Sequence, residues 1–385
     1  MSLPACAEEG HVVEFPEDFM IESGVCRVPL YETTRKVNVK ERWRERLLAE
    51  VLMEEFKLTA KYIEDAAAAG KLLLNGCPCD SQDVLHNGDI ITHTYAREEP
   101  AICGEHIVVL AENSHVLVVQ KPRGMPCHPQ GKFHRAALTE LLRSSHLKVA
   151  DAYLHPVNRL DRPTSGVVLL AKTRKAYMLL ARELPEMHKI YLARVRGAFS
   201  AEAVRQADPG MLRHVELRTR DIDDPETVAA RADEVWTGPW EVACHLPLKV
   251  EKHQPHQPLM TVVDPAEGQP ASSFFCKIRD FGDSTSLVQC QLLHGRTHQI
   301  RVHLNALGFP IVGDPIYGAN VPPSEIDSDA LPEHPMCLHA ALYAVRLPAS
   351  PEAAEALQEV LPAAAELAQL PGMRAYQSRR PTWAG

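Results

Sequence analysis

One carboxylate in this chain has surroundings that suit it for chemistry on a bound substrate. Asp161 lies between two arginines, Arg159 and Arg162, and the largely apolar run 167–172 follows. Such a run is typical of a buried strand. Because nearby positive charge favours the ionised form of a carboxyl group, the two guanidinium groups should keep Asp161 charged. An ionised carboxylate on a rigid segment of backbone can act as a nucleophile or a general base.

A plainer interpretation is a structural ion pair between Arg159 and Asp161 that closes a turn. Structural pairs also perturb carboxylates, so residues 155–166 alone leave both interpretations open. The choice between them depends on the rest of the chain.

Three further segments have residue types and spacing that point to a functional role. Segment 116–129 has the pattern of a strand followed by a turn rich in Pro and Gly, and the alternation in 188–197 predicts another strand. Segment 292–318 contains His298 and His303, which are five positions apart with no Glu between them. The H-E-x-x-H helix of zinc proteases is therefore absent.

Together these segments are similar to a known enzyme family. Residues 155–166 resemble the Arg-Leu-Asp-x-x-Thr-Ser-Gly motif of the RluA-type pseudouridine synthases, and the other three segments resemble that family's remaining blocks in the same order. Residues 295–303 match its Gly-Arg-x-His-Gln-Ile-Arg-x-His block almost letter for letter. The resemblance implies an α+β fold with a mixed, largely antiparallel central sheet flanked by helices and loops. It also implies a reaction that detaches uracil from ribose at N1 and rejoins it through C5.

The resemblance assigns catalytic roles to Asp161, Arg296 and Tyr191. A uracil inside a stack cannot meet a carboxylate, so the nucleotide must be flipped into a pocket. Asp161 would then attack the sugar or remove a ribose proton, two routes that the sequence leaves open. Arg296 would hold Asp161 in a bidentate ion pair. Tyr191 would stack on the flipped base, an interaction worth ~1–3 kcal/mol per base.

Four other basic residues are candidates for RNA contact, namely Arg159, Arg162, Lys189 and Arg301, with a packing role as the alternative for the last three. Arg159 would fill the vacated stack or grip a phosphate. No cofactor or metal is expected, because the implied reaction involves no redox change and no net hydrolysis. The chain also has no glycine loop of the kind that binds dinucleotides or phosphates.

The charge distribution is compatible with an RNA partner although the net charge is −9. Three segments, 1–22, 221–234 and 321–335, carry net charges of −6, −5 and −4. Segment 155–196 has nine Lys or Arg against three acids, a net charge of +6. A local basic surface is what phosphate contacts require.

At 385 residues the chain is long enough for two folded units. The pattern predicts four regions: an irregular extension over 1–34, a small domain over 35–100, a catalytic domain over 101–348 with a variable insertion at about 198–268, and a C-terminal helix (351–370) and tail within 349–385. The stretch His253–Pro258 in the insertion is interpreted as a polar loop, with a metal site as the less favoured reading.

The small domain resembles the S4-like RNA-binding module. Its pattern is a basic segment, 35–46, that leads into a helix, a second helix capped by Thr59 and ended by Gly70, and a hairpin through Asn75-Gly76. Residues 26–34, 40–48 and 69–76 resemble the N-terminal extension of the eukaryotic branch that includes the tRNA pseudouridine-32 synthases. This favours tRNA as the substrate, with rRNA or mRNA, or an inactive RNA-binding scaffold, as alternatives.

Cysteine usage and hydropathy indicate the class of compartment. Ten cysteines are scattered without framework spacing, which favours reduced thiols in the cytoplasm or nucleus. The first ten residues include Glu8 and Glu9 and no basic residue, which argues against a secretory signal or a typical mitochondrial presequence, with a mitochondrial location kept as an alternative. The sequence has no run of eighteen apolar residues, so no membrane-spanning helix is predicted. A monomer is expected.

Overall fold

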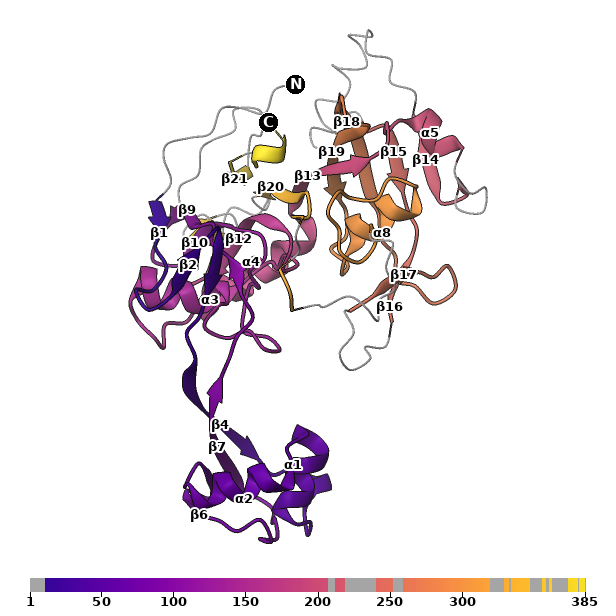
Figure 1. The fold of residues 1–385 in the computed structure, drawn as a ribbon. Coiled ribbons are helices and arrows are strands. Elements are labelled where there is room, and N and C mark those ends of the chain that lie inside the picture. Colours follow the sequence, from indigo (N-terminus) through magenta and orange to yellow (C-terminus); the bar gives the residue numbers. More distant parts are fainter. Residues whose placement is uncertain are drawn as a thin grey trace. The chain divides into compact units, whose positions relative to one another are not determined.

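The computed structural model describes residues 11–206, 212–218, 240–251, 259–318, 329–331, 334–346, 355–357, 360–361, 373–379 and 381–384. It divides into two compact units (Figure 1). The small unit is Val28–Glu99, and the large unit comprises Met1–Arg27 and Pro100–Gly385.

The large unit is built on a twelve-stranded mixed sheet. Its strands are, in spatial order, β1 (His11–Val13), β9 (Ile107–Glu112), β10 (Val116–Lys121), β12 (Ser165–Ala171), β20 (Leu338–Arg346), β13 (His188–Arg196), β19 (Thr285–Leu292), β18 (Ser273–Phe281), β15 (Val242–Cys244) and β14 (Val215–Leu217). The short strand β11 (His155–Pro156) pairs with β12, and β21 (Met373–Gln377) pairs with β20. Among these pairings β12–β20 is parallel and the others are antiparallel. The predicted α+β class with a largely antiparallel central sheet is confirmed.

The strand that follows Asp161 lies in the centre of this sheet. Residues 167–171 are fully buried, as the apolar run predicted. Gly166 opens the strand with φ +119°, and a Cβ placed there would lie 2.2 Å from the carbonyl oxygen of Ala340 on β20. Only glycine tolerates both the backbone conformation and the close approach. The chain is therefore locked in register immediately after the Asp161 loop.

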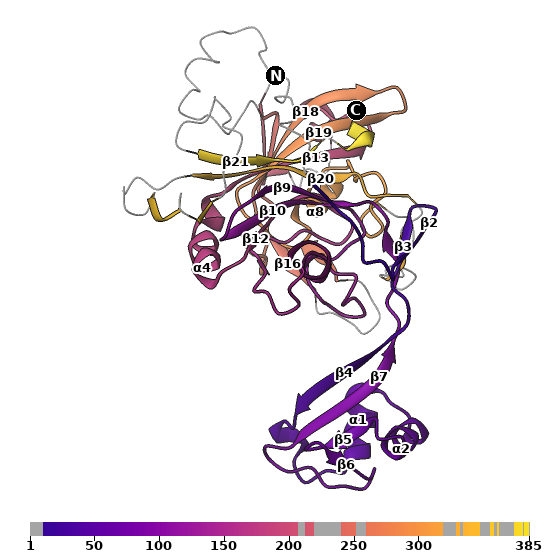
Figure 2. The same cartoon turned by 90° about the vertical axis from the view of Figure 1, so that its left-hand side faces the viewer.

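Helices of the large unit flank the sheet. Helix α4 (Arg174–Glu183) packs beside β12 (Figure 2), and α8 (Gln299–Ala306) packs against β17 (Thr261–Val263) and β18. Helix α3 (Leu138–Leu141) continues into a π-helical stretch, Leu142–Leu147. The remaining elements are α5 (Ala201–Arg205), the strand β16 (Leu248–Val250) that pairs with β17, the three-stranded sheet β2 (Met20–Glu22), β3 (Val25–Arg27) and β8 (Ile102–Cys103), and the 3-10 turns Leu184–Glu186 and Thr382–Ala384.

The small unit packs two helices on a four-stranded sheet. The strand order is β4 (Tyr31–Asn38), β7 (Ile90–Arg97), β5 (Leu72–Leu74) and β6 (Cys77–Pro78), and the helical elements are the 3-10 turn Glu41–Trp43, α1 (Leu48–Phe56) and α2 (Ala60–Ala68). The Thr59 side chain accepts a hydrogen bond from the Tyr62 amide, which confirms the predicted N-cap. Gly70 follows α2 with φ +69°. The core of this unit contains Trp43, Leu48 and Ile63, all nearly inaccessible.

Parts of the predicted organisation are wrong. Residues 11–34 are not irregular, because they contain β1, β2, β3 and the start of β4. These short strands exist through pairing with distant partners, such as β1 with β9, and a three-residue run carries no pattern of its own. Within the region predicted as a variable insertion, β14 and β15 pair with each other and extend the main sheet.

Other predictions fall on residues that are not described. His253–Pro258, the acidic run 221–234 and most of 321–335 lie outside the described residues. So does most of the predicted helix 351–370, of which 355–357 and 360 are helical. The tail after it contributes strand β21. In the part of the chain that is described, no helix has the length and hydropathy to cross a membrane.

Two buried histidines should make the fold sensitive to acid. His303 on α8 bonds Ser273 Oγ and the Leu246 carbonyl, and His339 on β20 bonds Ser165 Oγ and Ser378 Oγ. Burial lowers the pKa of each imidazole from 6.5 to about 4. The unfolded chain then binds more protons between these values, so the free energy of unfolding rises with pH in that window.

We therefore expect the free energy of unfolding to fall as pH drops from about 6.5 towards 4. Each group contributes up to about 1.4 kcal/mol per pH unit while it is protonated only in the unfolded chain. Urea unfolding at a series of pH values measures the slope, and His303→Gln should reduce it. An unchanged slope in a variant that also carries His339→Gln would contradict this assignment.

Candidate active site

Asp161 lies in a wide cleft of the large unit. The cleft has a volume of about 1310 Å³, and Asp161, Tyr191, His298 and Arg301 are among the residues that line it. The Asp161 side chain is 27% exposed, so its carboxylate is accessible from the cleft while the loop that carries it is fixed. The Thr164 amide donates to the Asp161 carbonyl at 3.0 Å, which closes a tight turn immediately before β12.

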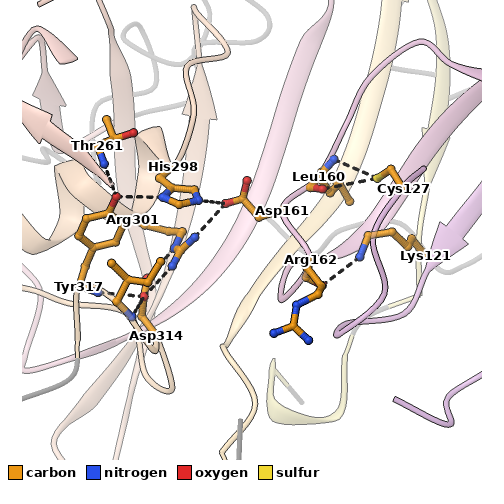
Figure 3. A network of polar contacts seen from close by, with 11 residues as sticks. Lys121, Cys127, Leu160, Asp161, Arg162, Thr261, His298, Arg301, Asp314 and Tyr317 are labelled. Atoms are coloured by element: carbon orange, nitrogen blue, oxygen red, sulfur yellow. Dashed lines mark hydrogen bonds and ion pairs between the residues drawn. The ribbon is translucent and has the colours of Figure 1, made fainter. Parts of the chain in front are cut away.

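A buried arginine joins Asp161 to a second carboxylate. Arg301 Nη1 lies 3.2 Å from Asp161 Oδ2, while Arg301 Nε and Nη2 donate to the two oxygens of Asp314 at 2.7 and 2.8 Å (Figure 3). Burial opposes the charge on Arg301, but the hydrogen bonds that Arg301 donates to Asp314 outweigh it and raise the pKa of Arg301. Likewise burial alone would raise the pKa of Asp314, and its bonds with Arg301 lower it. The guanidinium thus presents a fixed positive charge to Asp161.

His298 approaches the same carboxylate oxygen from another direction. Its Nε2 is 3.8 Å from Asp161 Oδ2, and its Nδ1 is 2.9 Å from the Tyr317 hydroxyl, which accepts the Thr261 amide at 2.8 Å (Figure 3). Because Tyr317 accepts from Thr261, its own proton is free to point at Nδ1. This arrangement favours the neutral tautomer with the proton on Nε2, facing Asp161. Burial lowers the pKa of His298, which favours the neutral ring.

The backbone conformation of His298 is unusual and explains how both side chains reach Asp161. His298 has φ +55° and forms the N-cap of α8. A non-glycine residue in the left-handed region turns the chain sharply. Arg301 is three residues further on, one turn into the helix, where its side chain is buried on the inner side.

The Asp161 loop is held from its other side by the turn that follows β10. Lys121 Nζ donates to the carbonyl oxygens of Pro122, Met125 and Arg162. The Leu160 amide donates to Cys127 Sγ at 3.3 Å (Figure 3). Lys121 is completely buried, and burial lowers its pKa to about 8. These bonds fix the residues on both sides of Asp161.

Tyr191 lies on β13 and faces the cleft with most of its surface covered. Its hydroxyl is 2.6 Å from the Tyr343 hydroxyl on β20, which fixes the direction of the ring. The two rings meet edge to face with centroids 6.2 Å apart. Burial raises the pKa of Tyr191, so it is a neutral phenol. Asp161 and Tyr191, the predicted carboxylate and aromatic partner, are thus brought to one cleft.

The predicted ion pair between Arg296 and Asp161 is wrong. Arg296 is exposed and its Nε donates to the Pro270 carbonyl at 3.1 Å, while Arg301 makes the contact with Asp161. Of the two roles expected for Arg301, phosphate contact and packing, a side chain 1% exposed and bonded to two carboxylates fits only packing. Arg296 precedes the turn at His298, so it is left on the rim of the cleft.

The other predicted basic residues also line the cleft. Arg159 is exposed there. Arg162 lies over the Phe133 ring and donates to the Ala330 carbonyl. Lys189 is largely buried and donates to the Leu184 carbonyl at 2.8 Å, and burial lowers its pKa.

Sequence reasoning missed the parts played by His298, Asp314 and Tyr317. All three lie within the segment 292–318 that the sequence had already singled out. The available signal was spacing, since His298 and Arg301 are three positions apart and share one face of a helix. Arg296 and Arg301 are five positions apart, about 140° around a helix, so the two arginines would not share a face.

Comparison with known proteins identifies the family. A model of the RNA pseudouridylate synthase family matches residues 115–306. A Saccharomyces cerevisiae tRNA pseudouridine(32) synthase, described as mitochondrial, is 32% identical over 314 residues, which cover 80% of this chain and 59% of the relative. Human pseudouridylate synthase RPUSD2 is 34% identical over 306 residues, covering 78% and 48%.

A second yeast relative is matched over most of its own length. The S. cerevisiae tRNA pseudouridine(31) synthase is 30% identical over 325 residues, covering 78% of this chain and 74% of the relative. The chain spans about half of the first two relatives. Taken with the family model, these matches establish that the chain belongs to the RluA-type family of RNA pseudouridylate synthases.

Proposed function

We propose that this chain isomerises a specific uridine of an RNA to pseudouridine. The observation that carries the proposal is the accessible carboxylate of Asp161, which a buried arginine and a neutral histidine orient in a cleft wide enough for a nucleotide. A carboxylate in such a setting suits nucleophilic or general-base work.

The proposed reaction conserves every atom of the nucleotide. The bond from N1 to C1′ breaks and a bond from C5 to C1′ forms, while C5 loses its proton and N1 gains one. Asp161 starts the reaction either by attack at C1′ or by removal of a ribose proton. In both routes Arg301 and His298 hold Asp161 Oδ2, which leaves Oδ1 towards the substrate.

The target uridine enters the cleft as a flipped nucleotide. Tyr191 offers the face or edge of a neutral ring to the base, and its bond to Tyr343 keeps that ring in place. Arg159 and Arg296, both exposed on the cleft, take the phosphates near the flipped nucleotide. Lys189 and Arg162 are weaker candidates for contact with RNA, because each already donates a hydrogen bond to a backbone carbonyl oxygen.

We propose tRNA as the substrate. The two yeast relatives are named for uridines 32 and 31 of tRNA. Mapping pseudouridine across total RNA, with and without this protein, tests the assignment. If the pseudouridines that depend on this protein lie only in rRNA or mRNA, that RNA replaces tRNA as the proposed substrate, and the proposed reaction is unchanged.

The decisive test of activity is release of tritium from RNA that contains 5-tritiated uridine, because the reaction expels the C5 proton. The wild-type protein should release tritium in proportion to pseudouridine formed. Binding of the same RNA without release would instead identify an RNA-binding protein on an inactive scaffold.

We further propose that the small unit, Val28–Glu99, is an S4-like RNA-binding module and that residues 101–348 form the catalytic domain. The support is a groove between sheet and helices whose lining includes Arg35, Phe56, Tyr62, His93 and Tyr95. Arg35 lies 5.6 Å from the Phe56 ring centroid, and the His93 and Tyr95 rings are 4.9 Å apart. Aromatic faces beside a cation are typical of surfaces that bind unpaired nucleotides.

Replacing Arg35 with Glu should therefore weaken RNA binding by about fivefold to tenfold, since a phosphate contact becomes a repulsion. The rate at saturating RNA should stay at the wild-type value, because Arg35 lies outside the catalytic cleft. The control is Lys61→Glu on the exposed side of α2, which makes the same charge change. Equal losses in both variants would show a general charge effect and remove the case for the groove.

We propose that the protein works in the cytoplasm or nucleus, with the mitochondrion as the alternative that the name of one yeast relative raises. Nine cysteines of the described residues are free thiols, which suits a reducing compartment. Fluorescent tagging in its source cells decides between these locations.

A further inference from the structure

A row of aromatic rings stands at the rim of the cleft. The rings of Tyr153 and His155 are nearly parallel, with centroids 6.4 Å apart, and His155 meets Tyr177 edge to face at 4.3 Å. His155 and Tyr177 line the same cleft as Asp161. Tyr153 is at the outer end of the row and is 41% exposed. The row is therefore continuous with the proposed catalytic cleft.

The row is held rigidly although its outer ring contributes little to the core. Arg143 donates to the carbonyl oxygens of Ala152 and Leu154, the neighbours of Tyr153, at 2.9 and 3.0 Å. His155 belongs to β11, which pairs with β12. Tyr177 lies in α4, whose first turn is capped by a Thr173 side chain that accepts the Ala176 amide at 3.2 Å. A pre-ordered aromatic surface loses little conformational entropy when a ligand stacks on it.

The charges beside the row select the kind of ligand. Arg159 is exposed on the cleft, and Arg174 is exposed one helical turn before Tyr177 on the same face of α4. Aromatic rings interleaved with cations suit an unpaired nucleotide, whose base stacks while its phosphate meets the guanidinium group.

We propose that Tyr153, His155 and Tyr177 form a subsite that stacks an unpaired base next to the flipped uridine in the substrate RNA. This inference rests on the proposed function and specifies its substrate class. A base in a duplex already stacks on its neighbours and is not free to stack on Tyr153. The subsite therefore selects uridines in single-stranded loops over uridines in stems.

The test measures the affinity of an unmodified tRNA transcript, one that the wild-type protein modifies, in an Asp161→Asn background where no turnover occurs. Tyr153→Ala should weaken binding by about fivefold to a hundredfold, the range that loss of one stacked base produces. Tyr153→Phe keeps a stacking face and should bind within about twofold of the background. The matched control is Met178→Ala, which removes a side chain 64% exposed on α4 and absent from the cleft lining.

A second arm removes the base rather than the ring. Abasic nucleotides are placed one at a time on each side of the target uridine, and each RNA is bound to the protein with and without Tyr153→Ala. When the abasic nucleotide is at the position that stacks, Tyr153→Ala should cause no further loss of affinity, because Tyr153 then has no base to stack on. A loss of affinity that persists with every abasic RNA overturns the subsite. The subsite is also overturned if Tyr153→Ala binds RNA as tightly as the Asp161→Asn background does, or if Met178→Ala loses as much affinity as Tyr153→Ala.

Failure of the subsite is distinguishable from failure of the proposed function. If the wild-type protein releases tritium while Tyr153→Ala binds normally, the subsite is wrong and the synthase activity stands. If the wild-type protein binds RNA but releases no tritium from any transcript, the activity is wrong, and with it the subsite for a neighbouring base. Thermal unfolding is the control for folding: Tyr153→Ala should unfold at the same temperature as the wild-type protein.

Discussion

Replacement of Asp161 with Asn should lower pseudouridine formation by more than about a thousandfold, the scale on which enzymes lose rate when a reacting group is removed. The amide is nearly the same shape as the carboxylate, so its oxygen can still accept from Arg301 Nη1. It has neither the negative charge nor the basicity that the proposed reaction needs. RNA affinity should change by no more than about threefold, because phosphate contacts supply most of that affinity.

Tritium release and an RNA-binding isotherm, measured on the same preparation, separate the two effects. Asp151→Asn is the matched control, since Asp151 is exposed and ten residues upstream. It should keep wild-type values in both assays. An Asp161→Asn protein that forms pseudouridine at a near-normal rate would remove Asp161 from the chemistry.

Replacement of Arg301 with Lys should reduce both activity and stability. The planar guanidinium of Arg301 donates two bonds to Asp314 and one to Asp161, a geometry that a single ammonium group cannot reproduce. Loss of a partner from a buried ion pair costs about 3–5 kcal/mol, and Lys keeps the charge, so we expect a loss of about 2 kcal/mol. The rate at saturating RNA should fall by about a hundredfold, because Asp161 is no longer held.

Arg296→Lys is the control for this substitution because it makes the same chemical change five residues away. Arg296 is exposed and donates one bond to a backbone carbonyl, so this variant should keep the wild-type rate and free energy of unfolding. Urea unfolding and tritium release at saturating RNA measure both quantities. An inactive Arg296→Lys beside an active Arg301→Lys would reverse the roles assigned to the two arginines.

The sequence was most informative where a function depends on residues that are adjacent in the chain. The apolar run after Asp161 predicted the buried strand β12, and alternation predicted β13, which carries Tyr191. Thr59 was recognised as an N-cap because capping involves residues within three positions of one another. Local patterns of this kind need no knowledge of distant contacts.

The same reasoning failed for short strands that exist only through their partners. Strand β1 is three residues long and forms because β9, about a hundred residues away, presents an open edge to it. The strands β14 and β15 likewise join the main sheet from a region that the sequence presented as an insertion. A single short strand is unstable in water, so its own residues carry little signal.

The sequence by itself contained the family-like motifs and indicated Asp161 as the proposed nucleophile or base and Tyr191 as its proposed aromatic partner. It did not determine which of two arginines in one short segment would meet Asp161. That choice was made by the left-handed turn at His298, which leaves Arg296 in solvent and places Arg301 inside the large unit. Arg301 is 140 positions from Asp161, and the charge is stable in the interior only because Asp314 neutralises it. Tertiary packing decides such a pairing because burying a charge requires partners that no local pattern names.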